Sequence, residues 1–305
     1  MLKKLFSLVI AAMLLVCGCA APAASAPSEP ESTPAPQKQL TFSDGMKLLA
    51  IGHSNTCASA YQLWPIFDAL GYKDFTLGVL WRGESTFKVH ATHARSDAKM
   101  FAYHKPTREK FSDPSETQTE NLTNYSAVLQ DEQWDAIVIY QGGGSFLDET
   151  QYRVDLKLLL GKIREYCPNA AIYYGMNFAY PVTSTTPSFK PYGYDQQAQH
   201  EAAVVAARDF IPKVDNIDGI IPLSTMMQSL RTKYGEAFHG SDLVHLNTAG
   251  SYVVGLMWYA ALTGLPIDPI TYCAAGVSQE MLQDLKNIIP RILEDPFTVI
   301  DISEK

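Results

Sequence analysis

The stretch KLLAIGHSN, residues 47–55, decides the fold of this 305-residue chain. Its first six residues form an apolar run of strand length that Gly52 ends, and Ser54 follows two residues later. In a parallel sheet such a serine lies at the carboxyl edge, where the ligands of these sheets bind. Ser54 is therefore a candidate nucleophile, although a serine after a strand often only caps a helix.

A second stretch, DLVHLN at residues 242–247, supplies the partners that a nucleophilic serine needs. Asp242 and His245 are three residues apart, so a turn can bring the carboxylate and the imidazole together. Ser54, His245 and Asp242 then match the nucleophile, the base and the orienting acid of a serine hydrolase. Asp242 could instead cap a helix that starts near Leu246, and capping is compatible with catalysis.

Apolar runs of strand length alternate with amphipathic stretches along the chain. This pattern predicts an α/β fold with three layers, α/β/α, around a central, mainly parallel five-stranded sheet. The predicted strands are 47–52, 75–81, 134–141, 170–177 and 219–223, and the predicted helices lie near 57–70, 119–132, 149–166, 195–211, 246–263 and 278–294. The polar span 84–118 is expected to form a loop or small hairpin that shapes a binding face. The sequence does not decide whether this span covers the site as a lid.

The N-terminal residues have the parts of a bacterial export signal, namely two lysines and a short apolar run. The signal ends at Val16-Cys17-Gly18-Cys19, which resembles a lipoprotein signal-peptidase box. We therefore expect a lipoprotein signal peptide over residues 1–18 and lipid attachment to Cys19, with an ordinary secretory signal as the alternative. The protein would be exported and held to the bacterial cell membrane by this lipid anchor alone, facing outside the cytoplasm.

Residues 19–39 are mostly Ala, Pro, Ser and Glu, so we expect the lipidated cysteine to be followed by a disordered tether. The remaining residues, 40–305, have the length of one domain. The net charge of −8 and the lack of a Lys and Arg cluster argue against a nucleic-acid partner. The sequence leaves the oligomeric state open.

Cysteine and histidine spacing gives no sign of a metal site. Cys57, Cys167 and Cys273 are widely spaced and odd in number, and we interpret them as small buried thiols. His90 and His93 have no further ligand at suitable spacing, and we interpret them as solvated loop histidines. No metal or cofactor is therefore expected.

These blocks together resemble the SGNH (GDSL-type) hydrolases, and more closely a bacterial branch of SGNH-like proteins of unknown function. The first block is Gly52-His53-Ser54-Asn55, the second-block glycine is Gly83 in WRGES, and the final block is Asp242-Leu243-Val244-His245. The segment 247–264 also resembles the closing helix of that branch, so the resemblance spans residues 47 to about 264. It implies a flavodoxin-like SGNH fold and an oxyanion hole that includes the backbone N–H groups of Ser54 and Gly83.

Two positions depart from the usual SGNH pattern. The third block, Gly-x-Asn-Asp, is absent, and residues 140–145 read YQGGGS instead. The resemblance implies that Gln141 replaces the missing side-chain amide of the oxyanion hole. Backbone amides of 142–144 could also serve, or the glycines could simply form a turn. His53 replaces an Asp or Asn that often braces this loop, and it is not expected to be the base because it points away from Ser54 on an extended chain.

The predicted function is a serine esterase that uses a Ser-His-Asp triad. The resemblance and the expected location imply an ester-bearing small molecule or acylated glycan as substrate, with acetyl or other small acyl groups removed from carbohydrate or cell-envelope material. Loop aromatics could stack on a sugar or merely pack: Trp81, Phe178, Tyr180, Tyr192 and Tyr194. The alternative is a catalytically inactive SGNH-scaffold surface lipoprotein that binds glycan or peptide.

Overall fold

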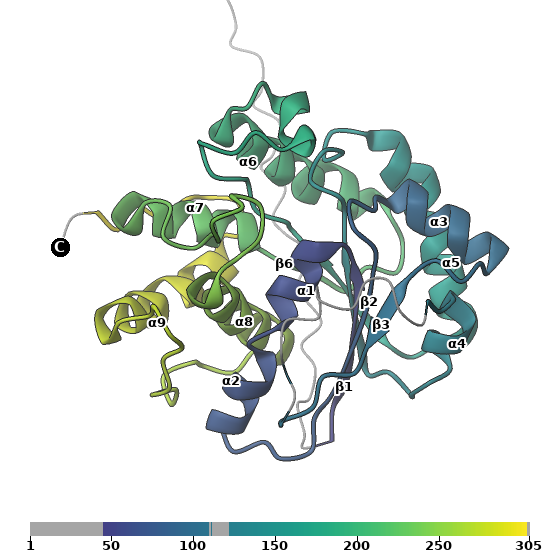
Figure 1. The fold of residues 1–305 in the computed structure, drawn as a ribbon, viewed down its shortest axis with the longest axis horizontal. Helices are drawn as coiled ribbons and strands as arrows, with labels where there is room; N and C mark the ends of the chain where they lie inside the picture. The colour runs from purple at the N-terminus through teal and green to yellow at the C-terminus, as the bar shows by residue number, and fades with distance from the viewer. Residues whose placement is uncertain (1–44, 110, 112–121, 304–305) are drawn as a thin grey trace, which may run out of the picture. The chain divides into compact units, whose positions relative to one another are not determined.

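A six-stranded sheet forms the centre of the computed structural model, which describes residues 45–109, 111 and 122–303. The strand order is β3-β2-β1-β4-β5-β6, and only the β2–β3 pair is antiparallel. The strands are β1 (Lys47–Gly52), β2 (Thr76–Trp81), β3 (Ala102–His104), β4 (Ala136–Tyr140), β5 (Ala171–Gly175) and β6 (Gly219–Ile221). Figure 1 shows helices on both sides of this sheet.

The predicted α/β fold with a mainly parallel sheet is confirmed, but the strand count was wrong. Without β3, the parallel strands follow the flavodoxin-like order, in which the chain changes direction between β1 and β4. The sixth strand, β3, lies in the span 84–118 that was expected to hold no helix. This span instead contains α3 (Phe87–Ser96) as well as β3.

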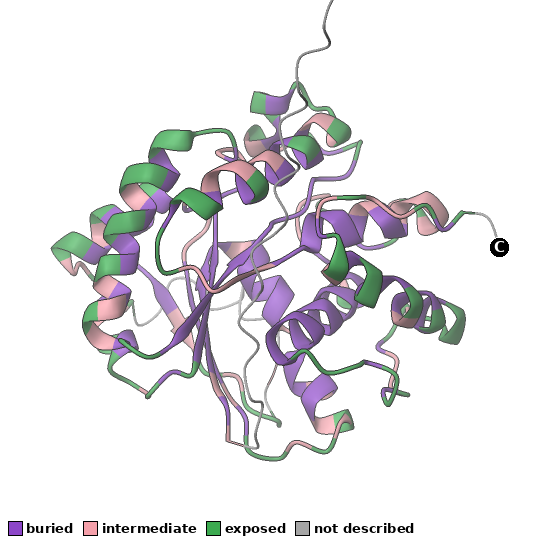
Figure 2. Cartoon of the chain, turned by 180° about the vertical axis from the view of Figure 1, so that it is seen from behind, coloured by how far each residue is buried: buried purple, intermediate pink, exposed green. Residues whose placement is uncertain are grey.

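The alternation of side chains along the strands separates two apolar cores. Leu48 and Ala50 of β1 face one core, while Leu49 and Ile51 face the other. The first core is covered by α1 (Ser54–Ala60), α2 (Leu63–Ala69), α7 (Leu223–Tyr234), α8 (Thr248–Thr263) and α9 (Gln279–Glu294). The second is covered by α3, α4 (Tyr125–Leu129), η2 (Gln151–Leu156), α5 (Lys157–Tyr166), η3 (Pro187–Tyr192), α6 (Gln196–Val205), η4 (Ala206–Phe210) and η5 (Ile211–Lys213). Because both faces are covered, the strands β1, β2, β4 and β5 are buried along almost their whole length, as Figure 2 shows, whereas the edge strands β3 and β6 are only partly buried.

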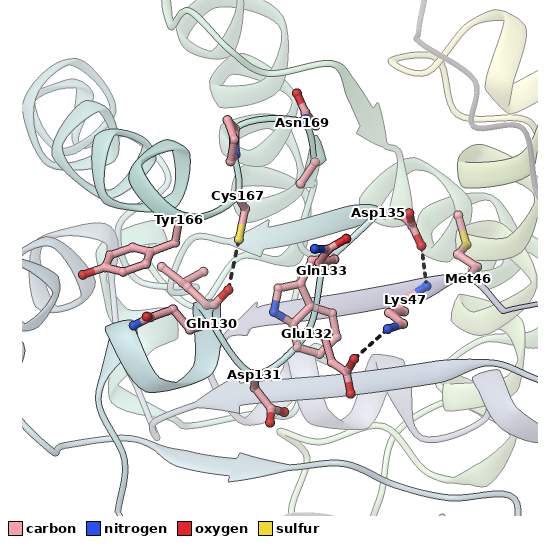
Figure 3. Close-up of a pocket in the computed structure, with 14 residues that line it drawn as sticks. Met46, Lys47, Gln130, Asp131, Glu132, Gln133, Asp135, Tyr166, Cys167 and Asn169 are labelled. Atoms are coloured by element: carbon pink, nitrogen blue, oxygen red, sulfur yellow. Dashed lines mark hydrogen bonds and ion pairs between the residues drawn. The ribbon is translucent and has the colours of Figure 1, made fainter.

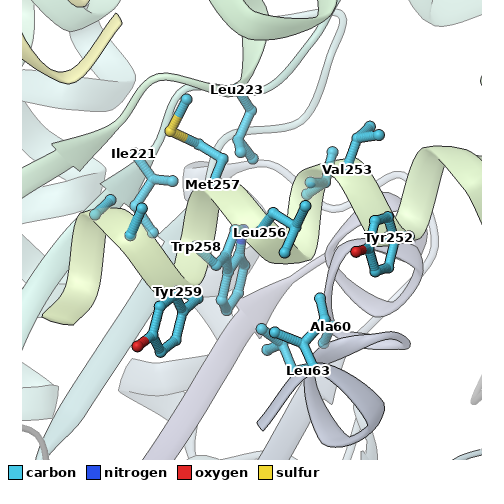
Figure 4. Packing of buried hydrophobic residues seen from close by; sticks show 14 of the residues in the cluster. Ala60, Leu63, Ile221, Leu223, Tyr252, Val253, Leu256, Met257, Trp258 and Tyr259 are labelled. Atoms are coloured by element: carbon cyan, nitrogen blue, oxygen red, sulfur yellow. The ribbon is translucent and has the colours of Figure 1, made fainter. Parts of the chain in front are cut away.

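Helix α8 is buried on all sides, and Figure 4 shows its aromatic and aliphatic side chains packed in the first core. Gly255 allows a close approach to α2, because a Cβ there would lie 2.7 Å from Ile66 Cδ1. Trp258 Nε1 donates to Tyr140 Oη at 2.8 Å, which ties the helix to β4. The helix begins after Asn247, whose side chain accepts from the N–H of Gly250, so Asn247 and not Asp242 caps it.

His90 is not a solvated loop residue, because α3 carries it into the second core. Its ring is fully buried and stacks on Phe101. Nδ1 lies 2.6 Å from Tyr125 Oη and Nε2 lies 2.9 Å from Ser85 Oγ. Ser85 Oγ also lies 2.9 Å from the Gly52 carbonyl, so this buried chain of hydrogen bonds ends beside the first block.

The expectations for the N-terminal segment concern residues that lie outside the described ranges. These are the signal peptide over 1–18, the lipidated Cys19 and the tether over 19–39. Within the described ranges, the structure has no helix that is both long and apolar enough for a membrane span.

Candidate active site

Ser54 is the first residue of α1 and follows β1 across a tight turn. Gly52 has no room for a side chain, since a Cβ there would lie 2.9 Å from Tyr140 Cβ. His53 is the N-cap of α1, and its backbone N–H donates to Thr56 Oγ1 at 3.0 Å. This turn places Ser54 at the carboxyl edge of the sheet between β1 and β4, where the strand order changes direction.

The His53 side chain braces this turn from inside the protein. Its Nδ1 accepts from the Asn55 N–H at 3.3 Å, so in the neutral ring the proton lies on Nε2, which donates to the Gln141 carbonyl at 3.2 Å. Asn177 Nδ2 contacts the same nitrogen at 3.2 Å but cannot donate to it in this tautomer. Burial lowers the pKa of His53 to about 4, against a weaker opposing effect of the Gln141 carbonyl. His53 therefore stays neutral near pH 7 and links the Ser54 turn to the end of β4.

Asp242 and His245 form the pair that the sequence predicts. His245 Nδ1 donates to Asp242 Oδ2 at 2.6 Å, while Oδ1 accepts from the N–H groups of Val244 and His245 at 3.0 Å each. Burial opposes the charge on Asp242, but these hydrogen bonds from His245 and Val244 leave its pKa below the usual value. The carboxylate thus holds the imidazole with Nε2 turned away from it.

His245 lies near the Ser54 turn, and one of its ring nitrogens is free. Its Nε2 is buried and has no hydrogen-bond partner within the described ranges. Val244 lines the same pocket as Ser54, and His245 is near enough to His53 to lower the pKa of that ring. Ser54 Oγ and His245 Nε2 are not hydrogen-bonded in this structure, as is common before a substrate tightens such contacts.

A pocket of about 160 Å³ opens beside Ser54, with the three glycines after Gln141 on its wall. A Cβ on Gly142 would lie 2.8 Å from the Ser85 carbonyl, and one on Gly143 would lie 2.9 Å from Tyr180 Oη. The backbone therefore forms this wall because no side chain fits. Other parts of the pocket are lined by His53, Glu84, Thr86, Ser145, Tyr180, Thr186, Ser188 and Val244.

Two predicted oxyanion donors lie elsewhere than expected. The amide of Gln141 is buried and turned inward, where Nε2 donates to the Ser145 carbonyl at 3.4 Å and to Gln151 Oε1 at 3.3 Å. Its Oε1 accepts from the N–H groups of Phe87 and Gly142. In this conformation Gln141 shapes the glycine loop but offers no donor to the pocket. Gly83 lies in the turn after β2 and does not line the pocket, although its neighbour Glu84 does.

Sequence reasoning missed Glu84 and, from the segment after β5, Thr186 and Ser188, although it named Tyr180. Glu84 directly follows the second-block glycine, and that position is the signal that could have identified it. Thr186 and Ser188 have no such signal, because only the folded loop brings them to Ser54. Most of the aromatic side chains considered for sugar stacking are buried, and Tyr194 alone among those five is exposed.

A larger hollow of about 1010 Å³ lies at the amino ends of the strands, away from Ser54 (Figure 3). An ion pair between Lys47 Nζ and Glu132 (2.8 Å) crosses its wall, and Asp135 accepts from the Lys47 N–H at 2.8 Å. Cys167 donates to the Leu129 carbonyl, and burial raises its thiol pKa to about 11. The hollow therefore contains no activated nucleophile. Although it is larger than the pocket beside Ser54, it is not a candidate catalytic site.

The predicted buried state of the cysteines holds for Cys57 and Cys167, whereas Cys273 is half-buried. Within the residues that the structure describes, no group of three His, Cys, Asp or Glu side chains could hold a metal ion.

Comparisons with known proteins found solved structures that superpose on this chain. A crystal structure of a DUF4886 family protein from Bacteroides uniformis ATCC 8492 superposes with a TM-score of 0.75 at 24% identity, covering 85% of this chain and 98% of the other. A candidate SGNH hydrolase from Slackia heliotrinireducens gives a TM-score of 0.45 at 18% identity over 72% of this chain and 100% of that one. An acetyl-xylooligosaccharide esterase from Geobacillus stearmophilus gives 0.46 at 13% identity over 77% and 100%.

The solved structures that the comparison found include proteins described as an SGNH hydrolase and as a GDSL-like lipase. The search of curated proteins found no match. The family model described as a domain of unknown function, DUF4886, matches residues 47–288, which is most of the chain. The protein therefore belongs to the DUF4886 family.

Proposed function

We propose that this protein is a serine esterase in which Ser54 is the nucleophile, His245 the base and Asp242 the acid that orients the base. The observation that carries the proposal is the Asp242–His245 hydrogen bond of 2.6 Å, together with the unpartnered Nε2 of His245. Leaving a buried ring nitrogen without a hydrogen-bond partner costs free energy. Acceptance of the proton from Ser54 is a function that would explain why this cost is tolerated.

In the proposed reaction, Ser54 Oγ attacks the ester carbonyl while His245 Nε2 takes its proton. Asp242 stabilises the imidazolium that forms, and His245 then protonates the leaving alcohol. Water, activated by the same imidazole, attacks the acyl enzyme and releases the acid. His53 takes no part in the proposed proton transfer, because burial lowers its pKa to about 4 and both ring nitrogens are hydrogen-bonded to backbone groups.

The oxyanion would be held by backbone donors rather than by a side-chain amide. The N–H groups of Ser54 and Gly143 have no hydrogen-bond partner among the described residues, and both residues line the pocket. Donors aimed at a developing oxyanion contribute on the order of 3–4 kcal/mol each to lowering the barrier. This assignment replaces Gln141 by Gly143 and leaves Gln141 the task of positioning the glycine loop through Gly142.

The small pocket favours a short acyl group, and the proposed substrate remains an ester-bearing small molecule or acylated glycan. Attachment to the membrane through Cys19, outside the cytoplasm, would bring the enzyme to cell-envelope material. The membrane attachment rests on the N-terminal sequence features described above.

Covalent labelling of the full chain tests the proposed nucleophile. A fluorophosphonate probe reacts with serines that a base activates, so it should modify Ser54 together with loss of hydrolysis of a chromogenic acetyl ester. Peptide mass spectrometry identifies the modified residue. Labelling of another pocket serine, such as Ser145 or Ser188, would contradict the assignment, and heat-denatured protein serves as the unreactive control.

Adding a methyl group to the glycine wall tests the proposed oxyanion donor. Gly143→Ala should lower kcat/KM for the chromogenic ester by about tenfold or more, because its Cβ would lie 2.9 Å from Tyr180 Oη. Tyr180→Phe removes that oxygen, so the double variant should recover part of the loss. An equal loss with and without the Tyr180 oxygen would show that the wall acts in another way.

A further inference from the structure

Glu84 stands at the mouth of the Ser54 pocket in an unusual backbone conformation. It follows β2 with a φ of 54°, in the left-handed region that glycine tolerates best. Its side chain is exposed and lines the pocket. The carboxylate is also close enough to Tyr180 to help raise the pKa of that hydroxyl, which burial brings to about 12. Tyr180 Oη in turn lies close to Gly143, so Glu84 and the proposed oxyanion donor share Tyr180 as a neighbour.

The charges around the pocket are one-sided. Glu84 is the only Asp, Glu, Lys or Arg among the described residues that line it. His53 is neutral near pH 7, and no described residue forms an ion pair with Glu84. Asp242, beside the pocket, is also an acid whose charge His245 only partly offsets. A substrate in the pocket therefore meets the negative charge of Glu84, and none of the described residues that line the pocket carries a fixed positive charge.

We propose that Glu84 determines which alcohol the esterase accepts: a leaving alcohol that is cationic or neutral with hydrogen-bond donors is favoured, and an anionic one is disfavoured. This inference rests on the proposed esterase function. The acyl oxygen is held by the amides of Ser54 and Gly143, and the 160 Å³ pocket has room for little beyond a short acyl group. The alcohol must then extend past the exposed rim, where Glu84 lies.

The expected size of the effect follows from Coulomb's law. A unit charge about 6 Å from a carboxylate, at an effective dielectric constant between those of water and the protein surface, changes kcat/KM by on the order of tenfold. Glu84 is exposed, so dissolved salt must weaken the effect. A steric preference for one alcohol would not depend on salt in this way.

Three acetyl esters of similar length test the inference on the full chain: acetylcholine, its uncharged isostere 3,3-dimethylbutyl acetate, and the acetyl ester of 4-hydroxybutyrate. The readout is the ratio of kcat/KM values, measured for wild type and Glu84→Gln. Glu294→Gln is the control, because it removes the same charge at the last residue of α9, which does not line the pocket. All rates are corrected for the Ser54→Ala background.

In wild type the cationic ester should exceed its isostere by about tenfold, and the anionic ester should fall below it. Glu84→Gln should move both ratios toward one, whereas Glu294→Gln should leave them as in wild type. Raising the salt from roughly 0.05 M to 0.5 M should move both ratios toward one in wild type and in Glu294→Gln, and should change them much less in Glu84→Gln. Hydrolysis with the same ratios in wild type and Glu84→Gln overturns the inference and leaves the esterase proposal standing. Absence of any Ser54-dependent hydrolysis overturns both.

Discussion

Replacement of Ser54 by alanine is expected to lower kcat for a chromogenic acetyl ester by roughly four orders of magnitude or more, because the acyl enzyme can no longer form. His245→Gln should cost about as much, since the hydroxyl loses the base that takes its proton. The double variant should be little worse than either single one, because residues that act together in one step do not contribute additively. The measurement is steady-state hydrolysis at saturating ester, with all variants at the same concentration.

The matched control for this series is Ser59→Ala on the same helix. Ser59 is buried and donates to the Asn55 carbonyl at 2.7 Å, so its loss should cost about 1 kcal/mol of stability without removing the nucleophile. Equal and negligible rates for wild type, Ser54→Ala and His245→Gln would instead favour a protein that binds its ligand without turnover. Purely additive losses would indicate that Ser54 and His245 do not share a step.

Acid is expected to destabilise the fold strongly, because four histidines are buried in the neutral form. Burial lowers the pKa to about 4 for His53 and His200 and to about 3 for His90 and His239. In the unfolded chain each of these histidines binds a proton near pH 6.5. Their contribution to the free energy of unfolding is therefore fully present above that pH and decreases as the pH drops toward 4. Each histidine contributes about 1.4 kcal/mol per pH unit in this window, or on the order of 2 kcal/mol between pH 7 and pH 5.

Urea unfolding at about pH 7, 6 and 5 measures this dependence. His90→Gln should reduce the slope of unfolding free energy against pH by about one histidine's share, because one titrating group is gone. Tyr125→Phe is the control: it removes the hydroxyl 2.6 Å from His90 Nδ1 and so lowers stability, but it leaves the ring that titrates. An unchanged slope in His90→Gln would show that His90 already binds its proton in the folded protein.

The sequence located the residues of the proposed triad, and the sheet beside them, because their signals are local. The run Lys47–Gly52 is apolar and of strand length, and the Asp-x-x-His spacing fits a single turn. Strand β3 and helix α3 were missed because polar residues surround them and their burial depends on distant partners. His90 illustrates this, since Ser85, Phe101 and Tyr125 enclose its ring only after folding.

The orientation of a side chain was harder to predict than its place in the chain. Gln141 does end β4, but its amide satisfies the backbone of Phe87 and Gly142 rather than facing the pocket. An amide side chain at the end of a strand can either face the pocket or bind nearby backbone groups. Nothing in the sequence indicates which of these two orientations it adopts. The role of His53 likewise depends on a contact that only the fold creates, because its Nε2 donates to the carbonyl of the distant Gln141.

The burial of α8 on all sides has a consequence for how the enzyme would assemble during folding. The base-bearing loop joins this helix directly through Asn247, and Ser54 lies almost two hundred residues earlier in the chain. Contacts of such long sequence separation form late, because closing the intervening chain costs entropy before any packing repays it. In a refolding experiment, the rate at which hydrolytic activity returns would therefore report the packing of the C-terminal helices, which is the last step. It would not report the earlier formation of the sheet.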